Sequence, residues 1–455
     1  MKIYNTASER KEDFAPSGPA VKMYVCGITP YDSCHLGHAM SYIIFDVIRR
    51  YLEFKGYQVT HVQNFTDIDD KIIDRSLRLS IHHQELTERY IQEFFTHMDS
   101  LNIMRAHQYP RATQEIPDMI HMISTLMEKG YAYSTDGDVY FRVANAAGYG
   151  TLSHRSLDGM MAGARVEVGA KKEHPMDFTL WKAAKAGEPS WDSPWGPGRP
   201  GWHIECSTMA LKYLDTTVDI HGGGQDLIFP HHENEVAQSE SYTGSSPFVR
   251  HWIHNGLLQM GEAKMSKSLG NLVTLKEALS RYSPDGIRLF VLSSHYRSPL
   301  TYSEEALAAA ERGAERLRNA CFLEEAASGI SNLDEGPFAH RFLNAMDDDF
   351  NTPLAISSLF DLARAINKAR EEGAQIKQAQ KKLLELSALL GITLKPKDKG
   401  AETTLAPLME LLIETRASLR LAKEYKLADT IRSRLQDLGI LLEDTPKGTI
   451  WKYKD

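Results

Sequence analysis

Cysteine is scarce in this chain. The 455 residues contain four, Cys26, Cys34, Cys206 and Cys321. That number is too small for a disulfide framework and leads us to expect a reducing, cytoplasmic setting. No apolar run reaches the ~18 residues of a membrane-spanning helix, and the first residues lack the apolar core of a signal peptide. We therefore do not expect a membrane protein.

An excess of positive charge is also missing. Lys and Arg number 52 and Asp and Glu number 60, so the net charge is −8. This balance excludes a generally basic coat for nucleic acid but leaves room for a local basic face. Hydrophobic residues make up 42% and charged residues 25%, which is typical of a globular protein and excludes a disordered or collagen-like chain. At ~150 residues per domain, the length indicates about three domains.

The first part of the sequence predicts a strand, a helix and a second strand. Residues 21–27 are a short apolar run closed by glycine, as in a buried strand. Residues 58–63 predict the second strand, and Gly56 is placed as the C-terminal cap of the helix between them. Apolar residues fall on one face of that helix at Ile44, Val47, Ile48, Tyr51 and Leu52. Such a βαβ unit opens a doubly wound α/β fold with a parallel sheet.

Later segments differ in character. Residues 90–135 show helical periodicity, whereas residues 188–201 are an irregular loop rich in Pro and Gly. Residues 303–390 are rich in Ala, Leu, Glu and Arg and predict a helical bundle. A charged linker at 395–400 then precedes a small module that is helical first and ends in a hairpin around 444–448.

Two histidines lie where the first helix is expected to begin, in His35-Leu36-Gly37-His38. A helix N-terminus offers free N–H groups and positive potential, which favour phosphate. Gly37 lets a nucleotide approach the backbone, and the two imidazoles can donate to phosphate oxygens. The alternative is a pair of surface or capping histidines, and the motif alone does not decide between the two.

A glycine-rich turn follows the strand predicted at 218–220, in His221-Gly222-Gly223-Gly224-Gln225-Asp226. Three glycines permit close contact between the backbone and a base or sugar. Asp226 can accept hydrogen bonds from ribose hydroxyls. Most such turns are only turns, and it is Asp226 that favours nucleotide binding here.

Two lysines occur in a loop of small residues, Lys264-Met265-Ser266-Lys267-Ser268. Their charges suit a polyphosphate whose negative charge grows in a transition state. Taken alone, a solvated charged loop is the simpler interpretation. Together with His35 and His38 on a βαβ scaffold, the lysines favour phosphate binding.

Four potential metal ligands are spread along the chain. His231 and Glu235 are four residues apart and share a helix face, while Cys26 ends the first strand and Cys206 follows Trp202. Two thiolates, an imidazole and a carboxylate form a reasonable Zn²⁺ set. The alternative is two buried structural cysteines and a surface glutamate, and the spacing alone favours it because no Cys-x-x-Cys is present. Cys34 and Cys321 fit small core residues.

Five stretches, in this order, give the chain a resemblance to a known family. They are residues 24–38, 64–71, 201–207, 221–235 and 264–268. The chain resembles class I aminoacyl-tRNA synthetases, and in detail the cysteinyl-tRNA synthetase family, over essentially its whole length. Leu36 stands where many members have Ile, a conservative difference that leaves both histidines and Gly37 intact.

The resemblance implies that ATP, with Mg²⁺, is a substrate. Histidines and a glycine of the first motif would hold its phosphates, the glycine-rich turn its nucleoside, and the two lysines the leaving pyrophosphate. These residues are His35, Gly37, His38, Gly222, Gly223, Gly224, Asp226, Lys264 and Lys267.

The resemblance also implies one Zn²⁺ and reverses the interpretation drawn from spacing alone. Its ligands would be Cys26, Cys206, His231 and Glu235, with the thiolate of substrate cysteine as a further ligand. The residues implied to line the amino-acid pocket are Gly27, Thr66 and Trp202.

A tRNA(Cys) partner is implied for the rest of the chain, which is expected to act as a monomer. The implied domains are a catalytic domain at 1–302 with an insertion at about 95–200 and a stem-contact region at about 255–302, a tRNA-binding bundle at 303–394, a linker at 395–404 and an anticodon-end module at 405–455. In that module Arg432 and Trp451 are candidate contacts to splayed bases. Their alternative roles are a surface charge and a packed aromatic.

Two rival functions stay open. A ligase that passes activated cysteine to a small amino-sugar would share the catalytic motifs, but it has no need of the last 50 residues or so. A non-catalytic zinc protein that binds RNA would not need His35, His38 and the two lysines. Activation of L-cysteine by ATP and its transfer to tRNA(Cys) is the function that the sequence favours.

Overall fold

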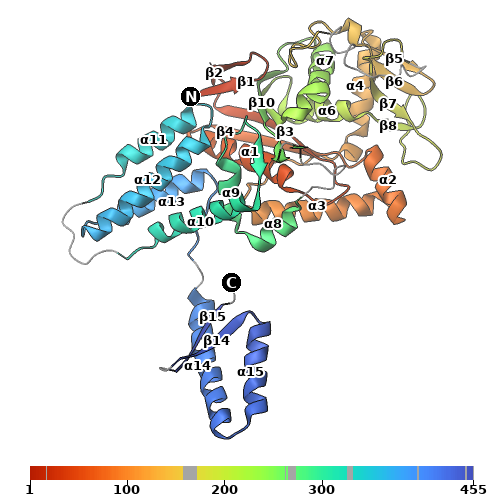
Figure 1. Ribbon diagram of the computed structural model, residues 1–455. Helices are drawn as coiled ribbons and strands as arrows, with labels where there is room; N and C mark the ends of the chain where they lie inside the picture. The colour runs from red at the N-terminus through yellow and green to blue at the C-terminus, as the bar shows by residue number, and fades with distance from the viewer. Residues whose placement is uncertain are drawn as a thin grey trace. The chain divides into compact units, whose positions relative to one another are not determined.

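The strand predicted at residues 21–27 lies inside a four-stranded parallel sheet. In the computed structural model this strand is β3 (Ala20–Ile28), which pairs with β4 (Gln58–Phe65) on one side and with β9 (Val218–Gly224) on the other. The fourth strand, β10 (Val249–Asn255), pairs with β9. All the pairings are parallel, so the carboxyl ends of the strands share one edge (Figure 1). The predicted α/β fold with a parallel sheet is confirmed.

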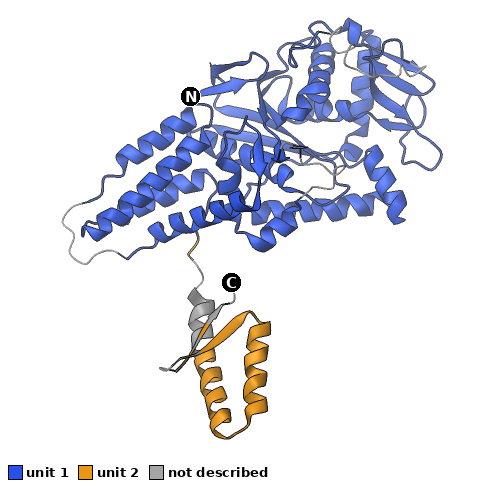
Figure 2. Cartoon of the chain, in the orientation of Figure 1, with its two compact units in different colours: residues 1–394 blue, residues 395–455 orange. Residues whose placement is uncertain are grey.

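The structure describes most of the chain in two compact units. The described residues are 1–16, 18–156, 172–261, 263–264, 273–324, 332–396, 399–445 and 448–453. The units are Met1–Leu394 and Lys395–Asp455 (Figure 2). Among the helices of the described residues, none has both the length and the apolar character needed to cross a bilayer.

The helix predicted after the first strand is α1 (Leu36–Phe54), and its apolar face is buried against the sheet. His35 is its N-cap: the His35 side chain accepts from the Gly37 N–H at 3.1 Å, and the His38 side chain accepts from the His35 N–H at 3.4 Å. This reciprocal pair satisfies N–H groups that the first helical turn leaves open. The two histidines of the sequence motif therefore cap the N-terminus of the helix that they begin.

Side chains of β3 alternate between two hydrophobic cores, one on each face of the sheet. Met23 and Val25 belong to the core that contains α1. Tyr24 and Cys26 belong to the other, which contains α6 (Trp202–Leu214). A residue at the end of β3 is thus placed next to α6 by the strand's period of two.

The segment between β4 and α6, which includes the insertion predicted at about 95–200, carries helices and a separate antiparallel sheet with strand order β5-β6-β7-β8. Its elements are α2 (Asp70–Leu79), α3 (His83–Ser100), α4 (Ile116–Glu128), β5 (Ala132–Thr135), β6 (Asp138–Phe141), β7 (Phe178–Ala183) and β8 (Gly198–Pro200). After β9 come a short turn, Gln225–Leu227, a π-helical turn, Ile228–His232, and α7 (Glu233–Thr243).

The helical bundle predicted for residues 303–390 is confirmed, with four helices of the first unit in the described part of this segment. They are α10 (Glu304–Cys321), α11 (Gly336–Asp347), α12 (Thr352–Glu371) and α13 (Lys377–Leu389). Smaller elements of this unit are β1 (Lys2–Asn5), β2 (Arg10–Asp13), β11 (Leu258–Met260), β12 (Ala263–Lys264), β13 (Leu300–Tyr302), α8 (Leu275–Arg281) and α9 (Pro284–Leu292).

The second unit is a small α/β module, as predicted. It consists of α14 (Lys399–Leu421), α15 (Tyr425–Asp437) and a hairpin of β14 (Ile440–Thr445) with β15 (Gly448–Tyr453). Its core gathers Met409, Leu435, Ile440 and Leu442.

A buried ion pair ties α1 to the end of the bundle. Arg288 of α9 donates from Nη2 to Asp46 Oδ2 of α1 at 2.5 Å, and both side chains are fully buried. Its Nε donates to the carbonyl of Leu390, at the end of α13, at 2.9 Å. The helix that begins with the two signature histidines is therefore anchored to the bundle by charge as well as by packing.

We expect Asp46→Ala to destabilise the first unit by about 3–5 kcal/mol, because it leaves the Arg288 guanidinium buried without its counter-charge. Urea unfolding followed by near-UV circular dichroism measures the free energy of unfolding. The control is Asp361→Ala, since Asp361 pairs with the half-exposed Arg341 and should lose less than about 1 kcal/mol. Equal losses in the two variants would contradict the role assigned to the buried pair.

Candidate active site and metal centre

The edge where the parallel strands end collects the residues that the sequence singled out. Cys26 and Gly27 lie near the end of β3, Thr66 directly follows β4, and Gly224 ends β9. Ligands in sheets of this kind bind outside the carboxyl ends of the strands. The predicted metal, amino-acid and nucleotide residues thus come from one edge of one sheet.

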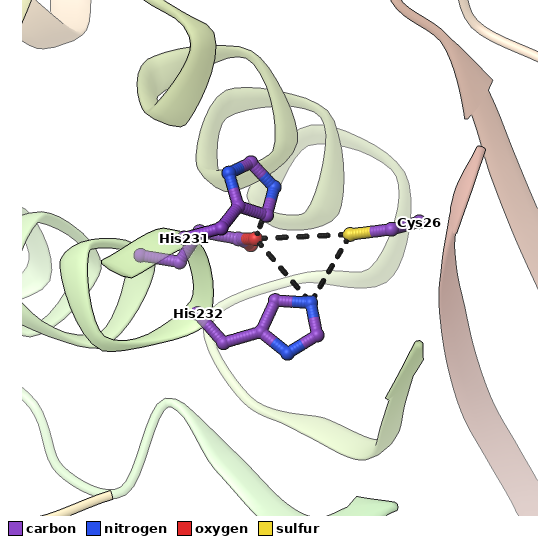
Figure 3. Close-up of side chains that lie close together, drawn as sticks. Cys26, His231 and His232 are labelled. Atoms are coloured by element: carbon purple, nitrogen blue, oxygen red, sulfur yellow. Dashed lines mark hydrogen bonds and ion pairs between the residues drawn. The ribbon is translucent and has the colours of Figure 1, made fainter. Parts of the chain in front are cut away.

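Four buried side chains converge there in an arrangement that could hold a metal ion. Cys26, His231, His232 and Glu235 each place one ligand atom within 4.8 Å of the others. Figure 3 shows the Cys26 sulfur facing the His232 ring. Cys26 Sγ lies 3.3 Å from His232 Nε2. Glu235 Oε1 lies 3.0 Å from His231 Nε2 and 3.8 Å from Cys26 Sγ.

Cys206, the remaining predicted ligand, lies beside this group. It is on α6, and its Sγ is 3.8 Å from Cys26 Sγ. The group within 4.8 Å thus contains three of the four predicted ligands and His232, and Cys206 lies next to its Cys26 member.

His232 was missed by the sequence reasoning, which placed only His231 and Glu235 on one helix face. His231 and His232 in fact close the π-helical turn before α7, and α7 begins at Glu233. In that turn both neighbouring rings reach the same cluster. The His-His pair in the sequence was the available signal, but the direction of two adjacent side chains depends on backbone geometry that periodicity does not give.

Further histidines hold the cluster in place. His221 Nε2 lies 2.9 Å from Glu235 Oε2, His203 Nδ1 lies 2.9 Å from His231 Nδ1, and His254 Nε2 lies 2.7 Å from His232 Nδ1. Contacts of this kind fix the ring orientation of a metal-binding histidine.

The electrostatics of the cluster favour a bound cation. Burial raises the pKa of Cys26, whereas the hydrogen bond from Cys26 lowers the pKa of Cys206. Burial alone would raise the pKa of Glu235, but His221 and His231 lower it to about 2. The pair of thiols thus carries one negative charge more readily than two, and a divalent ion supplies the positive charge that a second thiolate needs. Two sulfurs, imidazole and carboxylate fit Zn²⁺ better than a hard cation.

The three residues predicted to line the amino-acid pocket adjoin the cluster. The Gly27 N–H donates to Asn64 Oδ1 at 2.9 Å, and a Cβ at Gly27 would overlap the Asn64 carbonyl oxygen. Trp202 is 41% exposed and stacks on the His231 ring, with the two ring centroids 4.3 Å apart. Thr66 donates to Glu205 Oε2 at 2.8 Å, and burial raises the pKa of Glu205.

The two signature histidines lie at the start of α1, where their rings stack 3.7 Å apart. The capping interpretation of His35 and His38 is thus confirmed, and phosphate binding stays a prediction. Nearby, a Cβ at Gly222 would overlap the ring of Phe45 on α1. This close packing of helix on strand is one physical reason for glycine there. Gly223 and Gly224 complete β9, and Asp226 is exposed in the turn that follows.

The lysine motif is described only in part. Lys264 ends the short strand β12, and Lys267 lies outside the described residues. In the second unit, Arg432 is exposed and donates to the Leu442 carbonyl at 3.1 Å. Trp451 is half-buried against the core of that unit. These contacts account for Arg432 and Trp451 without RNA, so their RNA contacts stay predictions.

Comparisons with known proteins agree with this geometry. The family model for the class I (C) tRNA synthetase catalytic domain matches residues 14–312, and the DALR domain model matches residues 341–395. The structure is similar to methionyl-tRNA synthetase of Mycobacterium tuberculosis in complex with methionyl-adenylate, with a TM-score of 0.59 and 16% identity over 82% of this chain and 88% of that one. These matches define a class I aminoacyl-tRNA synthetase.

Full-length relatives narrow the class further. The chain is 59% identical to the cysteine–tRNA ligase of Dehalococcoides mccartyi strain 195 over 100% of both chains. It is 49% identical to the cysteine–tRNA ligase of Heliobacterium modesticaldum over 99% of each. The chain belongs to the cysteine–tRNA ligase family.

The cluster predicts that the purified protein binds Zn²⁺ and that Cys206→Ser loses most of it on dialysis, because a hydroxyl is a poor zinc ligand. Zinc is measured by atomic emission against protein concentration. Cys321→Ser is the matched control, since Cys321 is also buried but belongs to the bundle core. Stoichiometric zinc in the dialysed Cys206→Ser protein would refute the ligand assignment.

Proposed function

We propose that this chain is a cysteine–tRNA ligase that activates L-cysteine with ATP and transfers the cysteinyl group to the 3′ end of tRNA(Cys). The observation that carries the proposal is the group of potential metal ligands, with the two sulfurs of Cys26 and Cys206, that lies beside Gly27 and Trp202. Likeness to cysteine–tRNA ligases along the whole chain supports it.

The metal centre explains how cysteine is selected. We infer that Cys26, Cys206, His231 and Glu235 hold one Zn²⁺. A Zn²⁺ ion held by these residues would supply a site that favours the thiolate of cysteine far more than the hydroxyl of serine. A pocket without a metal separates such near-isosteres only about 10²-fold. Selection by coordination removes the need for an editing site.

Activation then depends on positioning. The substrate carboxylate attacks the α-phosphate of Mg·ATP in line and releases pyrophosphate. His35 and His38, at the positive end of α1, would hold the phosphates, and Lys264 and Lys267 would neutralise the charge that develops on the leaving group. Gly222 to Gly224 and Asp226 would receive the nucleoside. The 3′-terminal hydroxyl of the tRNA takes the cysteinyl group in the second step.

The remaining domains fit an RNA partner. We propose that the bundle, at 303–394, and the terminal module, at 405–455, bind tRNA, with Arg432 and Trp451 as contacts in the module. Between 405 and 455 nine Lys and Arg oppose eight Asp and Glu, a net charge of +1, against −9 for the rest of the chain. The tRNA would therefore contact positive charge that is local to this module, since the chain as a whole is negatively charged. We further propose that the enzyme is a cytoplasmic monomer.

A cysteine ligase that acts on an amino-sugar is the less favoured alternative, because the relatives matched over their full length are cysteine–tRNA ligases.

The activity expected of this chain is ATP-dependent attachment of radiolabelled cysteine to tRNA(Cys). Acid-precipitable counts measure it, with tRNA of another specificity as the control. Adenylate formation without transfer to tRNA would favour the amino-sugar ligase, and absence of both would favour a non-catalytic RNA-binding protein.

A chain ending at Leu394 tests the role of the terminal module. Residues 1–394 form a compact unit with its own cores. We expect the shortened chain to keep cysteine-dependent ATP–pyrophosphate exchange and to lose at least about tenfold in kcat/KM for tRNA, or 1.4 kcal/mol. Unchanged charging would show that the module does not contribute to tRNA recognition.

A further inference from the structure

Three consecutive aspartates lie at the corner between α11 and α12, and each of them binds a different part of the first unit. Asp347 accepts from the Tyr51 hydroxyl, near the end of α1, at 2.8 Å. Asp348 is exposed and pairs with Lys11 of β2. Asp349 differs from both because its side chain is fully buried. It is therefore the one aspartate of the three that belongs to the interior.

The backbone at this corner is in an unfavourable conformation. Asp349 and Phe350 have φ angles of +62° and +50°, in the left-handed region that residues other than glycine rarely adopt. Two such residues in succession persist only where the surrounding contacts fix them. The Asp349 N–H donates to the Lys2 carbonyl at 2.9 Å, and the Phe350 ring packs edge-on against Tyr51. The corner is thus held in one conformation by elements on two sides.

The carboxylate of Asp349 holds the turn between α9 and β13. Its Oδ1 accepts from the Tyr296 hydroxyl at 2.7 Å and from the Tyr4 N–H at 2.8 Å. Its Oδ2 accepts from Arg297 Nε at 2.9 Å and lies 3.7 Å from His295 Nε2. One buried side chain at the corner of the bundle therefore contacts three consecutive residues of a segment that is distant in the sequence.

This turn supports the strand that leads to the lysine motif. The Tyr296 carbonyl accepts from the Gly256 N–H at 2.8 Å, and a Cβ at Gly256 would overlap the Ser298 carbonyl oxygen. Shortly after Gly256 begins β11, which pairs in parallel with β13 and antiparallel with β12, the strand that ends at Lys264. Contacts therefore run without a break from Asp349, through Tyr296 and β11, to the backbone of Lys264.

We propose that Asp349 is a positioning residue for the activation step, and that it acts through Tyr296 and β11 on the placement of Lys264. The inference rests on the proposed function, in which Lys264 neutralises the charge that develops on the leaving pyrophosphate. Because that charge is largest in the transition state, a displaced lysine lowers kcat and leaves the KM of the substrates nearly unchanged. A carboxylate of the bundle thus affects the chemical step in the catalytic domain.

Two variants weaken the contact between Asp349 and the turn. Tyr296→Phe removes one hydroxyl and keeps the ring, and Asp349→Asn keeps a residue type that tolerates the left-handed backbone. In each we expect kcat of cysteine-dependent ATP–pyrophosphate exchange to fall about tenfold, equivalent to 1.4 kcal/mol. KM for cysteine and the zinc content should change less than about twofold. Asp348→Asn is the matched control with full activity expected, since it removes the pair with Lys11 and none of the contacts of Asp349.

A second background separates positioning from a loss of folded protein. A structural defect lowers the fraction of active enzyme by the same factor whichever residue is at position 264. A positioning defect depends on the lysine, so Asp349→Asn should slow adenylate formation about tenfold in the unaltered chain and less than about twofold in Lys264→Ala. The rate is measured in a single turnover with enzyme in excess, which resolves slow variants. If Asp349→Asn fails to fold, Tyr296→Phe is compared in the same two backgrounds.

Four results would overturn the proposal: an unchanged kcat in Tyr296→Phe and Asp349→Asn, a higher KM for cysteine at unchanged kcat, equal losses in the two backgrounds, or full activity of Lys264→Ala. An unaltered protein without cysteine-dependent exchange would instead overturn the proposed function, and this inference with it. The two failures are distinguished because the first is seen only in the variants and the second already in the unaltered protein.

Discussion

The position of β3 between β4 and β9 is the constraint on which the site depends. Its parallel register, Val25 opposite Gln63 on one side and Gly222 on the other, makes three distant segments of the chain end at one edge. The period of two along β3 then directs Cys26 to the face covered by α6. Shifting the register by one residue would turn Cys26 to the opposite core and remove a thiol from the cluster.

The price of this arrangement is a concentration of ionisable groups in the interior. Two cysteines, a glutamate and several histidines are nearly or fully buried around one point, and buried polar groups destabilise a protein unless they are paired. Hydrogen bonds between the histidines and Glu235 offset part of that cost. A divalent ion at the thiols would offset more. The buried negative charges of the folded chain would thus be neutralised in part by a bound ion.

Local patterns predicted the parts of the fold that local physics determines. The apolar spacing from Ile44 to Leu52 predicted the helix α1, and Gly56 predicted where that helix ends. Spacing alone argued against zinc, because Cys26 and Cys206 meet only through the pairing of strand and helix. His232 was missed for a related reason, because its contact with the cluster depends on the π-helical turn.

Phe45 and Gly222 illustrate how this architecture constrains change in the chain. The aromatic ring of Phe45 on α1 fills the space where a side chain at Gly222 would be. This contact sets the distance between α1, which begins with His35 and His38, and the strand that leads to Asp226. A larger residue at 222 is compatible with the fold only if position 45 becomes smaller. These two positions, far apart in the sequence, should therefore co-vary. A relative with a side chain at position 222 should have a smaller residue than Phe at position 45.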